Sequence, residues 1–227
     1  PVSVRLNPKK NINQEYGDSI PWVTEGRYLS SRPVFTLDPH LHAGAYYVQE
    51  ASSMFLEQAV IQSIDVSKPL RVLDLCAAPG GKSTHILSLL NSRSLLVSNE
   101  VIRSRASILA ENIQKWGHHN VIVTTGDPEN FQVLEGFFDL IVVDAPCSGE
   151  GLFRKDTEAM KEWSPANIEL CSHRQQRILS AIWPSLKQGG VLIYSTCTYN
   201  ENENEDNLLW LKNKRELEFI SIKCEDA

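Results

Sequence analysis

The chain has 227 residues, of which 42% are hydrophobic and 22% are charged, a length that suggests one large domain with at most a small appendage. This composition is ordinary for a globular protein and excludes collagenous, repetitive and disordered classes. No apolar run approaches the ~18 residues that span a bilayer, and no signal peptide opens the chain, so we expect neither a membrane protein nor a secreted one. The five cysteines lack the tight spacing of a disulfide framework and favour a reducing, cytoplasmic setting.

The formal net charge of −6 by itself argues against a nucleic-acid partner, but the charge is unevenly distributed along the chain. Residues 201–227 hold eight acidic and four basic residues, and we expect this acidic tail to form a solvent-exposed terminal helix. Residues 151–190 hold six basic and four acidic residues. The composition therefore permits a local basic face on an acidic chain.

The first 45 residues are irregular, and five prolines divide them into short β-like pieces such as Val2–Leu6 and Trp22–Thr24. We expect a small accessory segment over residues 1–45, an incomplete RNA-binding subdomain, followed by a catalytic domain over residues 46–227. The first residue is a proline and not a methionine, so the chain is expected to be part of a longer one. Apolar residues at helical spacing predict a helix over Tyr46–Ile64.

From residue 70 onward, short apolar strands alternate with helical runs. This alternation predicts an α/β domain of Rossmann-like type, a mostly parallel sheet covered on both faces, in which ligands bind at the carboxyl ends of the strands. The predicted strands are Arg71–Cys76, Leu95–Asn99, Val121–Thr125, Asp139–Asp144 and Val191–Ser195. The predicted helices are His85–Leu90, Ile102–Trp116, Pro165 to about Leu186, and Asn204–Lys212.

A glycine-rich turn follows the first predicted strand. Its small residues and two glycines let a ligand approach the backbone closely, and the next helix offers N–H donors at its start. The turn matches neither the dinucleotide fingerprint nor the phosphate loop, and a plain strand-to-helix turn remains the alternative. It reads Asp74-Leu75-Cys76-Ala77-Ala78-Pro79-Gly80-Gly81-Lys82-Ser83-Thr84.

Acidic residues end the second and third predicted strands. Glu100 lies about twenty residues beyond the glycine pair, a spacing that suits a carboxylate that accepts hydrogen bonds from both ribose hydroxyls. Asp127 ends the third strand, where a carboxylate can accept from an adenine amino group. The alternatives are a solvated acid at Glu100 and an ordinary Gly-Asp turn at Asp127.

The fourth and fifth predicted strands each end in a cysteine. Asp144 closes the fourth strand and Cys147 follows three residues later, while Cys197 follows the fifth strand. Because adjacent parallel strands end at the same edge of a sheet, we expect the two thiols to lie close together. The alternative is that each is a buried small hydrophobic residue. Paired zinc-ligand spacing does not occur, so no metal site is predicted.

Four runs of the chain, in this order and spacing, resemble the S-adenosylmethionine-dependent RNA cytosine-5 methyltransferases of the Sun (Fmu) type. They are Tyr47–Met54, Leu73–Thr84, Asp144–Gly151 and Tyr194–Thr198. The resemblance covers about residues 45–210 and is closest to the bacterial members that modify 16S ribosomal RNA, through Asp144–Gly151 and the adjoining Arg154-Lys155-Asp156. Those members often carry a further N-terminal helical piece and a C-terminal RNA-binding extension, which again suggests that this chain is part of a longer one.

The resemblance implies roles for the residues at the strand ends. Cys197 would be the nucleophile that adds to C6 of cytosine, Asp144 would hold the base, and Cys147 would assist release of the product. Lys82 points from the glycine-rich turn toward the same site, where its ammonium could lower the pKa of a thiol, or could instead lie on the surface. The cofactor S-adenosylmethionine would be bound by Cys76, Ala77, Ala78, Pro79, Gly80, Gly81, Lys82, Glu100, Arg105, Asp127 and Asp144.

The expected partner is RNA, in which the target cytosine is single-stranded or flipped so that both faces of its C5–C6 bond are exposed. We expect a monomer that binds ribosomal RNA. Alternatives are a transfer-RNA methyltransferase, a DNA cytosine-5 methyltransferase, which would use Cys147 as its nucleophile, and a non-catalytic RNA-binding assembly factor. Basic residues that could contact phosphate, or could instead lie on solvated helix faces, are Arg154, Lys155, Lys161, Arg174 and Arg177.

Overall fold

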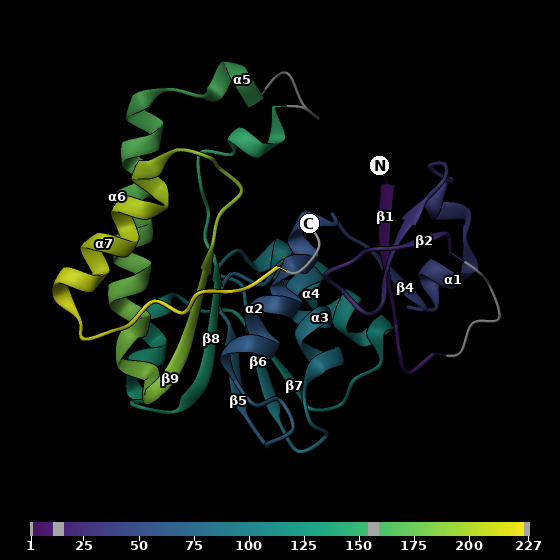
Figure 1. Cartoon of the computed structure of the whole chain (residues 1–227), viewed down its shortest axis with the longest axis horizontal. Helices are drawn as coiled ribbons and strands as arrows, with labels where there is room; N and C mark the ends of the chain where they lie inside the picture. Colours follow the sequence, from purple (N-terminus) through teal and green to yellow (C-terminus); the bar gives the residue numbers. More distant parts are fainter. Residues whose placement is uncertain (1, 11–15, 154–158, 225–227) are drawn as a thin grey trace. The chain divides into compact units, whose positions relative to one another are not determined.

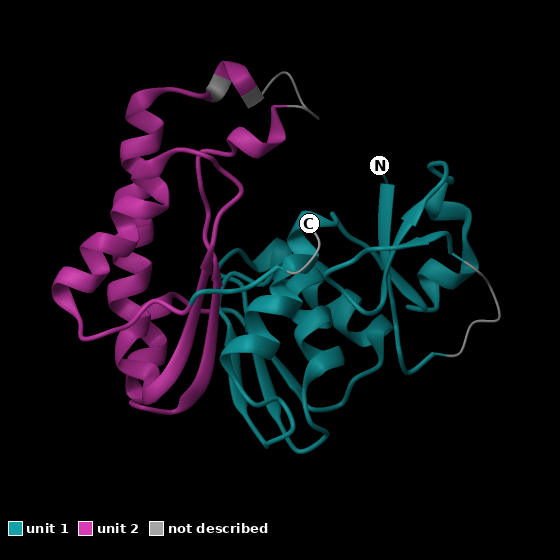
Figure 2. Ribbon diagram, in the orientation of Figure 1, with its two compact units in different colours: residues 1–125, 221–227 teal, residues 126–220 magenta. Residues whose placement is uncertain are grey.

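The computed structural model describes residues 2–10, 16–153 and 159–224. The chain divides into two compact units, one formed by residues 1–125 with residues 221–227 and the other by residues 126–220 (Figure 2). We call these unit 1 and unit 2 and describe each by itself. In the described part of the chain, no helix is both long and apolar enough to cross a membrane.

Unit 1 begins with a small antiparallel sheet (Figure 1). Its strand order is β2-β3-β1-β4, with β3 and β4 both paired to β1. Val4, Tyr16 and Tyr46 form the buried centre of its core. The bounds are β1 Val2–Leu6, β2 Asp18–Ser19, β3 Gly26–Leu29 and β4 Tyr46–Val48, and a short helix, α1, covers Pro39–His42.

Two predictions for this region are wrong. Residues 22–24 lie in a turn and not a strand, because hydrogen bonds from the Val23 N–H to the Ile20 carbonyl and from the Gly26 N–H to the Val23 carbonyl close the backbone there. The helix predicted over residues 46–64 starts ten residues later, at Leu56, because residues 46–48 pair with β1. The predicted domain boundary after residue 45 therefore falls at the start of β4, the last strand of the small sheet.

The rest of unit 1 is an α/β layer with parallel strands in the order β7-β6-β5. Val72, Leu73 and Leu96 are fully buried, as expected for parallel strands covered on both faces. Helix α4 ends at Gly117, whose φ of +79° is the left-handed conformation that glycine adopts at a helix end. The bounds are α2 Leu56–Ser63, β5 Arg71–Asp74, α3 Gly81–Leu89, β6 Leu95–Asn99, α4 Arg103–Trp116 and β7 Val121–Thr124.

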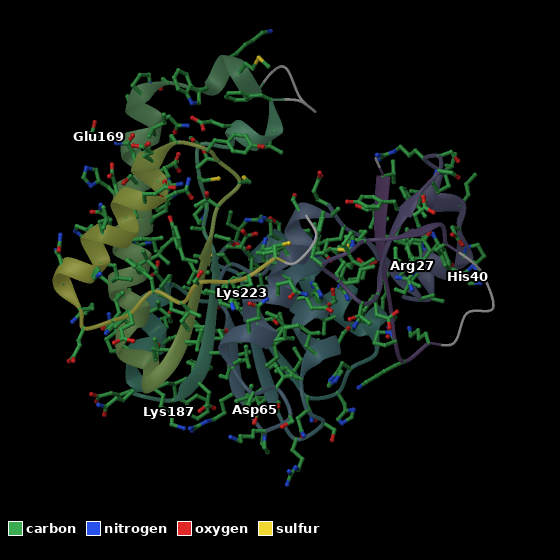
Figure 3. The ribbon with its side chains drawn as sticks, viewed as in Figure 1. Arg27, His40, Asp65, Glu169, Lys187 and Lys223 are labelled. Atoms are coloured by element: carbon green, nitrogen blue, oxygen red, sulfur yellow. The ribbon has the colours of Figure 1, made fainter. Side chains whose placement is uncertain are left out.

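Unit 2 contains two parallel strands, in which Asp144 at the end of β8 lies in register with Ser195 at the end of β9. At the other end of these strands, the Lys187 Nζ donates to Asp139 Oδ1 at 2.8 Å (Figure 3). The long helix α6 packs against α7, and the Ser164 hydroxyl caps its start. The bounds are β8 Phe138–Asp144, α5 Ala159–Glu162, α6 Pro165–Ile182, β9 Leu186–Ser195 and α7 Glu205–Lys214.

The predicted α/β alternation after residue 70 is confirmed. All five predicted strands are present, and parallel pairing is observed among the strands of each unit. The largest difference is β9, which starts at Leu186 and not at Val191, so it includes Gly189 and Gly190. These strands end where the motifs of the sequence begin, which gives each candidate residue a defined support.

A buried arginine ties the small sheet to the start of α3. The Arg5 side chain is 1% exposed, and its guanidinium donates to Gln49 Oε1 at 2.9 Å, the Thr84 hydroxyl at 2.6 Å and the Gly81 carbonyl at 3.2 Å. It also lies 4.5 Å from the ring centre of Trp116. Burial lowers the pKa of Arg5 to about 9, so it stays charged at neutral pH. Arg5 of β1 thus fixes the Gly81 carbonyl, at the start of α3, by a hydrogen bond.

A second buried pair makes the stability of unit 1 sensitive to acid. His85, 1% exposed, contacts Glu57 Oε2 through Nε2 at 2.9 Å, while its Nδ1 has no hydrogen-bond partner among the described residues. Burial lowers the pKa of His85 to about 4 despite the neighbouring carboxylate, so the ring is neutral at pH 7. Burial would raise the pKa of Glu57, but its hydrogen bonds from His85 and Thr24 outweigh burial and lower it.

We expect the free energy of unfolding to fall as the pH drops from about 6.5, where an unfolded histidine takes up its proton, to about 4. Over this range the unfolded chain binds a proton that the folded His85 does not, which removes about 3 kcal/mol at most. Urea unfolding at a series of pH values measures the effect. A His85→Gln variant should lose this part of the pH dependence and His173→Gln, at an exposed site, should keep it. Equal pH dependence in both variants would contradict the assignment.

Candidate active site

Two side chains of α4 hydrogen-bond to the backbone of the glycine-rich turn of unit 1. The Arg105 guanidinium donates to the Ala78 carbonyl at 2.9 Å, and the Asn112 amide donates to the Pro79 carbonyl at 2.8 Å. Gly80 has a φ of +113°, which side-chain-bearing residues rarely adopt, and it precedes α3 directly. A Cβ at Gly81 would lie 3.3 Å from the Tyr47 ring. The backbone conformation and the close packing therefore favour glycine at residues 80 and 81. The turn leads directly into the N-terminus of α3, a position where backbone N–H groups can bind a ligand.

Glu100 follows β6 and carries a buried carboxylate that is incompletely satisfied. Its side chain is 3% exposed, and Oε1 accepts from the Ile102 N–H at 3.0 Å. Oε2 lies 3.2 Å from the Arg105 guanidinium but accepts no hydrogen bond from any described residue. A buried acceptor of this kind normally has a donor. The hydroxyls of a ribose would supply one, so the residues of this turn fit an adenosine-containing cofactor.

Two other predicted residues have structural partners of their own. The Lys82 ammonium donates to the Ser53 hydroxyl at 3.5 Å within unit 1. In unit 2, Asp127 accepts from the Glu129 N–H at 3.1 Å and pairs with Arg177 at 3.1 Å. These bonds outweigh the effect of burial and lower the pKa of Asp127. Arg177, which we considered for phosphate contact, is therefore paired with the residue that we considered for adenine.

The two strand-end thiols of unit 2 lie together, as the sequence predicts. The sulfur atoms of Cys147 and Cys197 are 3.0 Å apart, and the Cys197 N–H donates to the Cys147 sulfur at 3.3 Å. Cys197 is exposed and Cys147 half-buried. Gly151 packs against the same loop, where its N–H donates to the Cys197 carbonyl at 2.8 Å and a Cβ would lie 2.6 Å from that oxygen. The close approach of the two loops thus depends on glycine at this position.

The hydrogen bond to Cys197 is the main cause that raises the pKa of Cys147 above its usual value, and burial adds to it. Two thiols this close cannot both ionise readily, because like charges repel strongly at this distance. The raised pKa keeps Cys147 protonated at neutral pH. Beside them, Asp144 Oδ1 accepts from the Ser195 hydroxyl at 2.9 Å, a bond between the last residues of β8 and β9.

A buried polar network that sequence reasoning missed supports both thiol loops. Glu203 is completely buried, and its carboxylate accepts from the Ser148 N–H at 3.0 Å, the Asn200 amide at 2.9 Å and the Gln175 amide at 2.7 Å. Gln175 also donates to the Pro146 carbonyl at 2.9 Å. The prediction of a solvent-exposed acidic tail is wrong for Glu203. In the sequence, Asn200 and Glu203 follow Cys197 by three and six residues, and this closeness to a candidate thiol could have identified them as its supports.

Four other basic residues were predicted as candidates for phosphate contact. Lys161 and Arg174 are exposed, whereas Arg154 and Lys155 lie outside the described residues.

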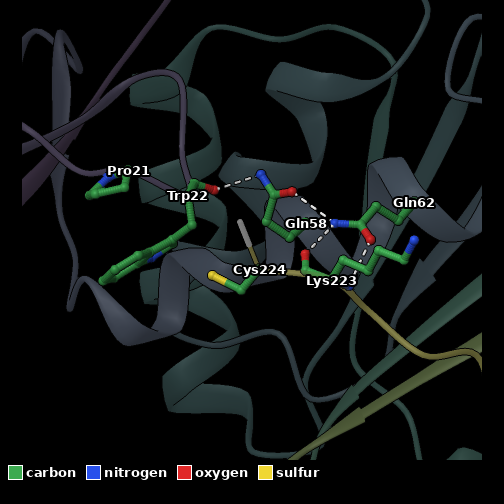
Figure 4. A pocket seen from close by; sticks show the side chains of 6 residues that line it. All are labelled: Pro21, Trp22, Gln58, Gln62, Lys223 and Cys224. Atoms are coloured by element: carbon green, nitrogen blue, oxygen red, sulfur yellow. Dashed lines mark hydrogen bonds between the residues drawn. The ribbon is translucent and has the colours of Figure 1, made fainter. Parts of the chain in front are cut away.

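A pocket of about 310 Å³ in unit 1, in which the Gln62 amide donates to the Lys223 carbonyl at 2.8 Å, contains none of the predicted site residues (Figure 4). It is lined by Pro21, Trp22, Gln58, Gln62, Lys223 and Cys224. No group of three possible metal ligands occurs among the residues that the structure describes.

Comparison with known proteins gives consistent matches. A family model described as 16S rRNA methyltransferase RsmB/F matches residues 61–227, and one described as the N-terminal domain of 16S rRNA methyltransferase RsmF matches residues 1–51. The chain is 41% identical over 226 residues to ribosomal RNA small subunit methyltransferase F of Escherichia coli O157:H7, which covers 92% of this chain and 47% of that protein. The chain thus spans about half the length of the curated relatives that it matches.

Solved structures agree with this result. A methyltransferase homologue from Pyrococcus horikoshii superposes with a TM-score of 0.75 at 29% identity, covering 94% of this chain and 70% of that one. NSun6 from Pyrococcus horikoshii, solved with SFG, gives a TM-score of 0.70 at 29% identity and covers 84% of this chain and 47% of that one. The fold is therefore the Rossmann-like fold of S-adenosylmethionine-dependent methyltransferases. More specifically, the chain belongs to the RsmB/F family of 16S rRNA methyltransferases.

Proposed function

We propose that this protein transfers a methyl group from S-adenosylmethionine to C5 of a cytosine in ribosomal RNA, through a covalent bond between Cys197 and C6 of the base. The observation that carries the proposal is the pair of thiols, 3.0 Å apart, at the carboxyl ends of β8 and β9. One thiol would suffice for a nucleophile. A second thiol in contact with it is useful in a reaction that must also remove a proton before the nucleophile can leave.

The cofactor residues of the proposal lie in unit 1, except for Asp127 and Asp144. The backbone of residues 76–82 would hold the methionine part of S-adenosylmethionine, and Glu100 Oε2 would accept from a ribose hydroxyl. Arg105 would keep Glu100 and the Ala78 carbonyl in place, because its guanidinium contacts both. When bound, the cofactor supplies an electrophilic methyl group.

In the proposed mechanism, the thiolate of Cys197 adds to C6 of the flipped cytosine. Asp144 would accept hydrogen bonds from the protonated N3 and from the exocyclic amine, so that the proton on N3 neutralises the charge that the thiolate brings to the ring and C5 becomes nucleophilic. Once Cys197 is bonded to carbon it is no longer charged, and the main cause of the raised pKa of Cys147 is removed. Cys147 then loses its proton to solvent, and its thiolate takes the C5 proton after methylation, which restores the C5–C6 double bond and expels Cys197 as a thiolate.

The test is incubation with S-adenosylmethionine that carries a labelled methyl group, in parallel with 16S ribosomal RNA, transfer RNA and DNA. We expect label in the ribosomal RNA, and bisulfite sequencing should locate it at C5 of a cytosine. Label on transfer RNA or DNA alone would support an alternative substrate. A chain that shows no heat of S-adenosylmethionine binding in calorimetry would instead point to a non-catalytic RNA-binding factor.

Glu100→Gln should weaken S-adenosylmethionine binding by about tenfold to a hundredfold, because a charged acceptor for the ribose hydroxyls becomes a neutral one. Isothermal titration calorimetry measures the change. Glu111→Gln on the exposed side of α4 is the matched control and should bind like the wild type. Equal affinity in the two variants would remove Glu100 from the proposed cofactor site.

A further inference from the structure

Two aromatic side chains connected to the thiol loops of unit 2 are partly or largely exposed to solvent. Tyr199 lies two residues after Cys197 and is 78% exposed, although large aromatic residues usually bury most of their surface. Trp163, on the segment between α5 and α6, is 39% exposed. The unit thus presents one exposed aromatic side chain on the loop that carries Cys197 and a second that is hydrogen-bonded to Glu150, three residues after Cys147.

One carboxylate holds both aromatic residues in place. Glu150 Oε1 accepts from the Trp163 indole N–H at 2.9 Å, and Oε2 accepts from the Tyr199 backbone N–H at 2.9 Å. Burial would raise the pKa of Glu150, but these bonds outweigh it and lower the pKa, so the carboxylate is charged at neutral pH. The Asn200 amide also donates to Glu150, at 3.3 Å. Since the indole N–H is used within the protein, the ring faces are what Trp163 has to offer a ligand.

Surroundings of this kind suit nucleic acid. A cytosine that leaves its stack to reach a thiol separates its neighbours, which then need new stacking partners. Aromatic rings supply stacking to any base, because every base has a π-face. The stretch of residues 151–190, which contains Trp163, holds six basic and four acidic residues, whereas the chain as a whole carries a net charge of −6.

We propose that Tyr199 and Trp163 form a stacking surface for the RNA bases that flank the target cytosine. This inference rests on the proposed function for its choice of RNA as the ligand. Glu150 is a positioning residue in it, since it contacts the Trp163 indole N–H and the Tyr199 backbone N–H and acts through those two residues. Tyr199 supplies its ring and not its hydroxyl, so phenylalanine should replace it without loss.

The experiment measures binding of two fluorescein-labelled single-stranded RNA 13-mers by anisotropy. One contains a single cytosine between purines, and the other has abasic nucleotides on both sides of that cytosine. We expect Tyr199→Ala to raise the Kd for the first RNA about tenfold and to leave the Kd for the abasic RNA unchanged. Tyr199→Phe should bind both as the wild type does, and Trp163→Ala should behave like Tyr199→Ala.

Phe219→Ala is the matched control, because Phe219 is a 51% exposed aromatic residue of the same unit that contacts Lys212. It should bind both RNAs normally. The inference is overturned if Tyr199→Ala binds the intact RNA as tightly as wild type, or loses affinity equally for both RNAs. Covalent capture of 5-fluorocytosine RNA by the wild type tests the reaction separately. Ring-dependent binding without capture would count against the proposed reaction and not against the stacking surface.

Discussion

Cys197→Ala is expected to abolish methyl transfer to RNA, with a loss of about 10⁴-fold or more in rate, because the reaction loses its nucleophile. No other group takes over, since Cys147 holds its proton and is half-buried. Removing one thiol costs the fold little, because the Cys197 side chain is exposed. Transfer of labelled methyl groups to ribosomal RNA measures the rate, and calorimetry with S-adenosylmethionine should show unchanged cofactor binding.

Cys147→Ala should give a different defect, which makes it the informative partner of this experiment. The nucleophile is still present, so the covalent bond to C6 forms, but the C5 proton is not removed and Cys197 is not released. We therefore expect a protein–RNA adduct to accumulate with ordinary cytosine, visible as a band of reduced mobility in a denaturing gel. Cys197→Ala should form no adduct even with 5-fluorocytosine RNA. If Cys147→Ala alone abolished that adduct, the roles would be exchanged, as in the DNA methyltransferase alternative.

Local sequence signals predicted the elements of this fold where the pattern was strong. β6 was predicted with its observed bounds, and α4 to within one residue, because a run of apolar residues and the terminal Gly117 mark their ends. Residues 46–48 were misread as helical because their strand conformation comes from pairing with β1, about forty residues earlier. Pairing between distant segments is not encoded in local periodicity, and it overrides propensity where it occurs.

The candidate site was predictable to the extent that strand ends define it. Cys147 and Cys197 are fifty residues apart in sequence, yet parallel pairing of the strands before them requires their proximity. The supporting carboxylate was not predictable in this way. Glu203 looks like one more acid of a charged tail, and its burial depends on an amide of α6 and a backbone N–H beside Cys147, 28 and 55 residues away. The Asp127–Arg177 pair escaped prediction for the same reason.

Glu203 accepts hydrogen bonds from residues that support both thiol loops, so we expect its replacement to have the largest effect on the stability of unit 2. The Ser148 N–H and the Gln175 amide, both donors to its carboxylate, hold the residues that flank Cys147. The Asn200 amide, the third donor, holds the loop that follows Cys197. Because Gln175 is fully buried and Ser148 and Asn200 are half-buried, Glu203→Ala would remove an acceptor from three donors at once and cost about 3 kcal/mol. Glu203→Gln keeps one acceptor oxygen and should cost less.

We expect Glu203→Ala to unfold at a temperature about 6–12 °C below wild type, as this loss predicts for a chain of this size. Below that transition, the rate of adduct formation with 5-fluorocytosine RNA should fall at least tenfold while S-adenosylmethionine binding is retained, since Glu100 and its supports lie in unit 1. Glu201→Ala, at an exposed position in the same turn, should match wild type in both measurements. A lower melting temperature with an unchanged adduct rate would mean that Glu203 stabilises the unit without positioning the thiols. Separation of the two readouts is informative because a carboxylate that only filled a buried space would affect stability alone.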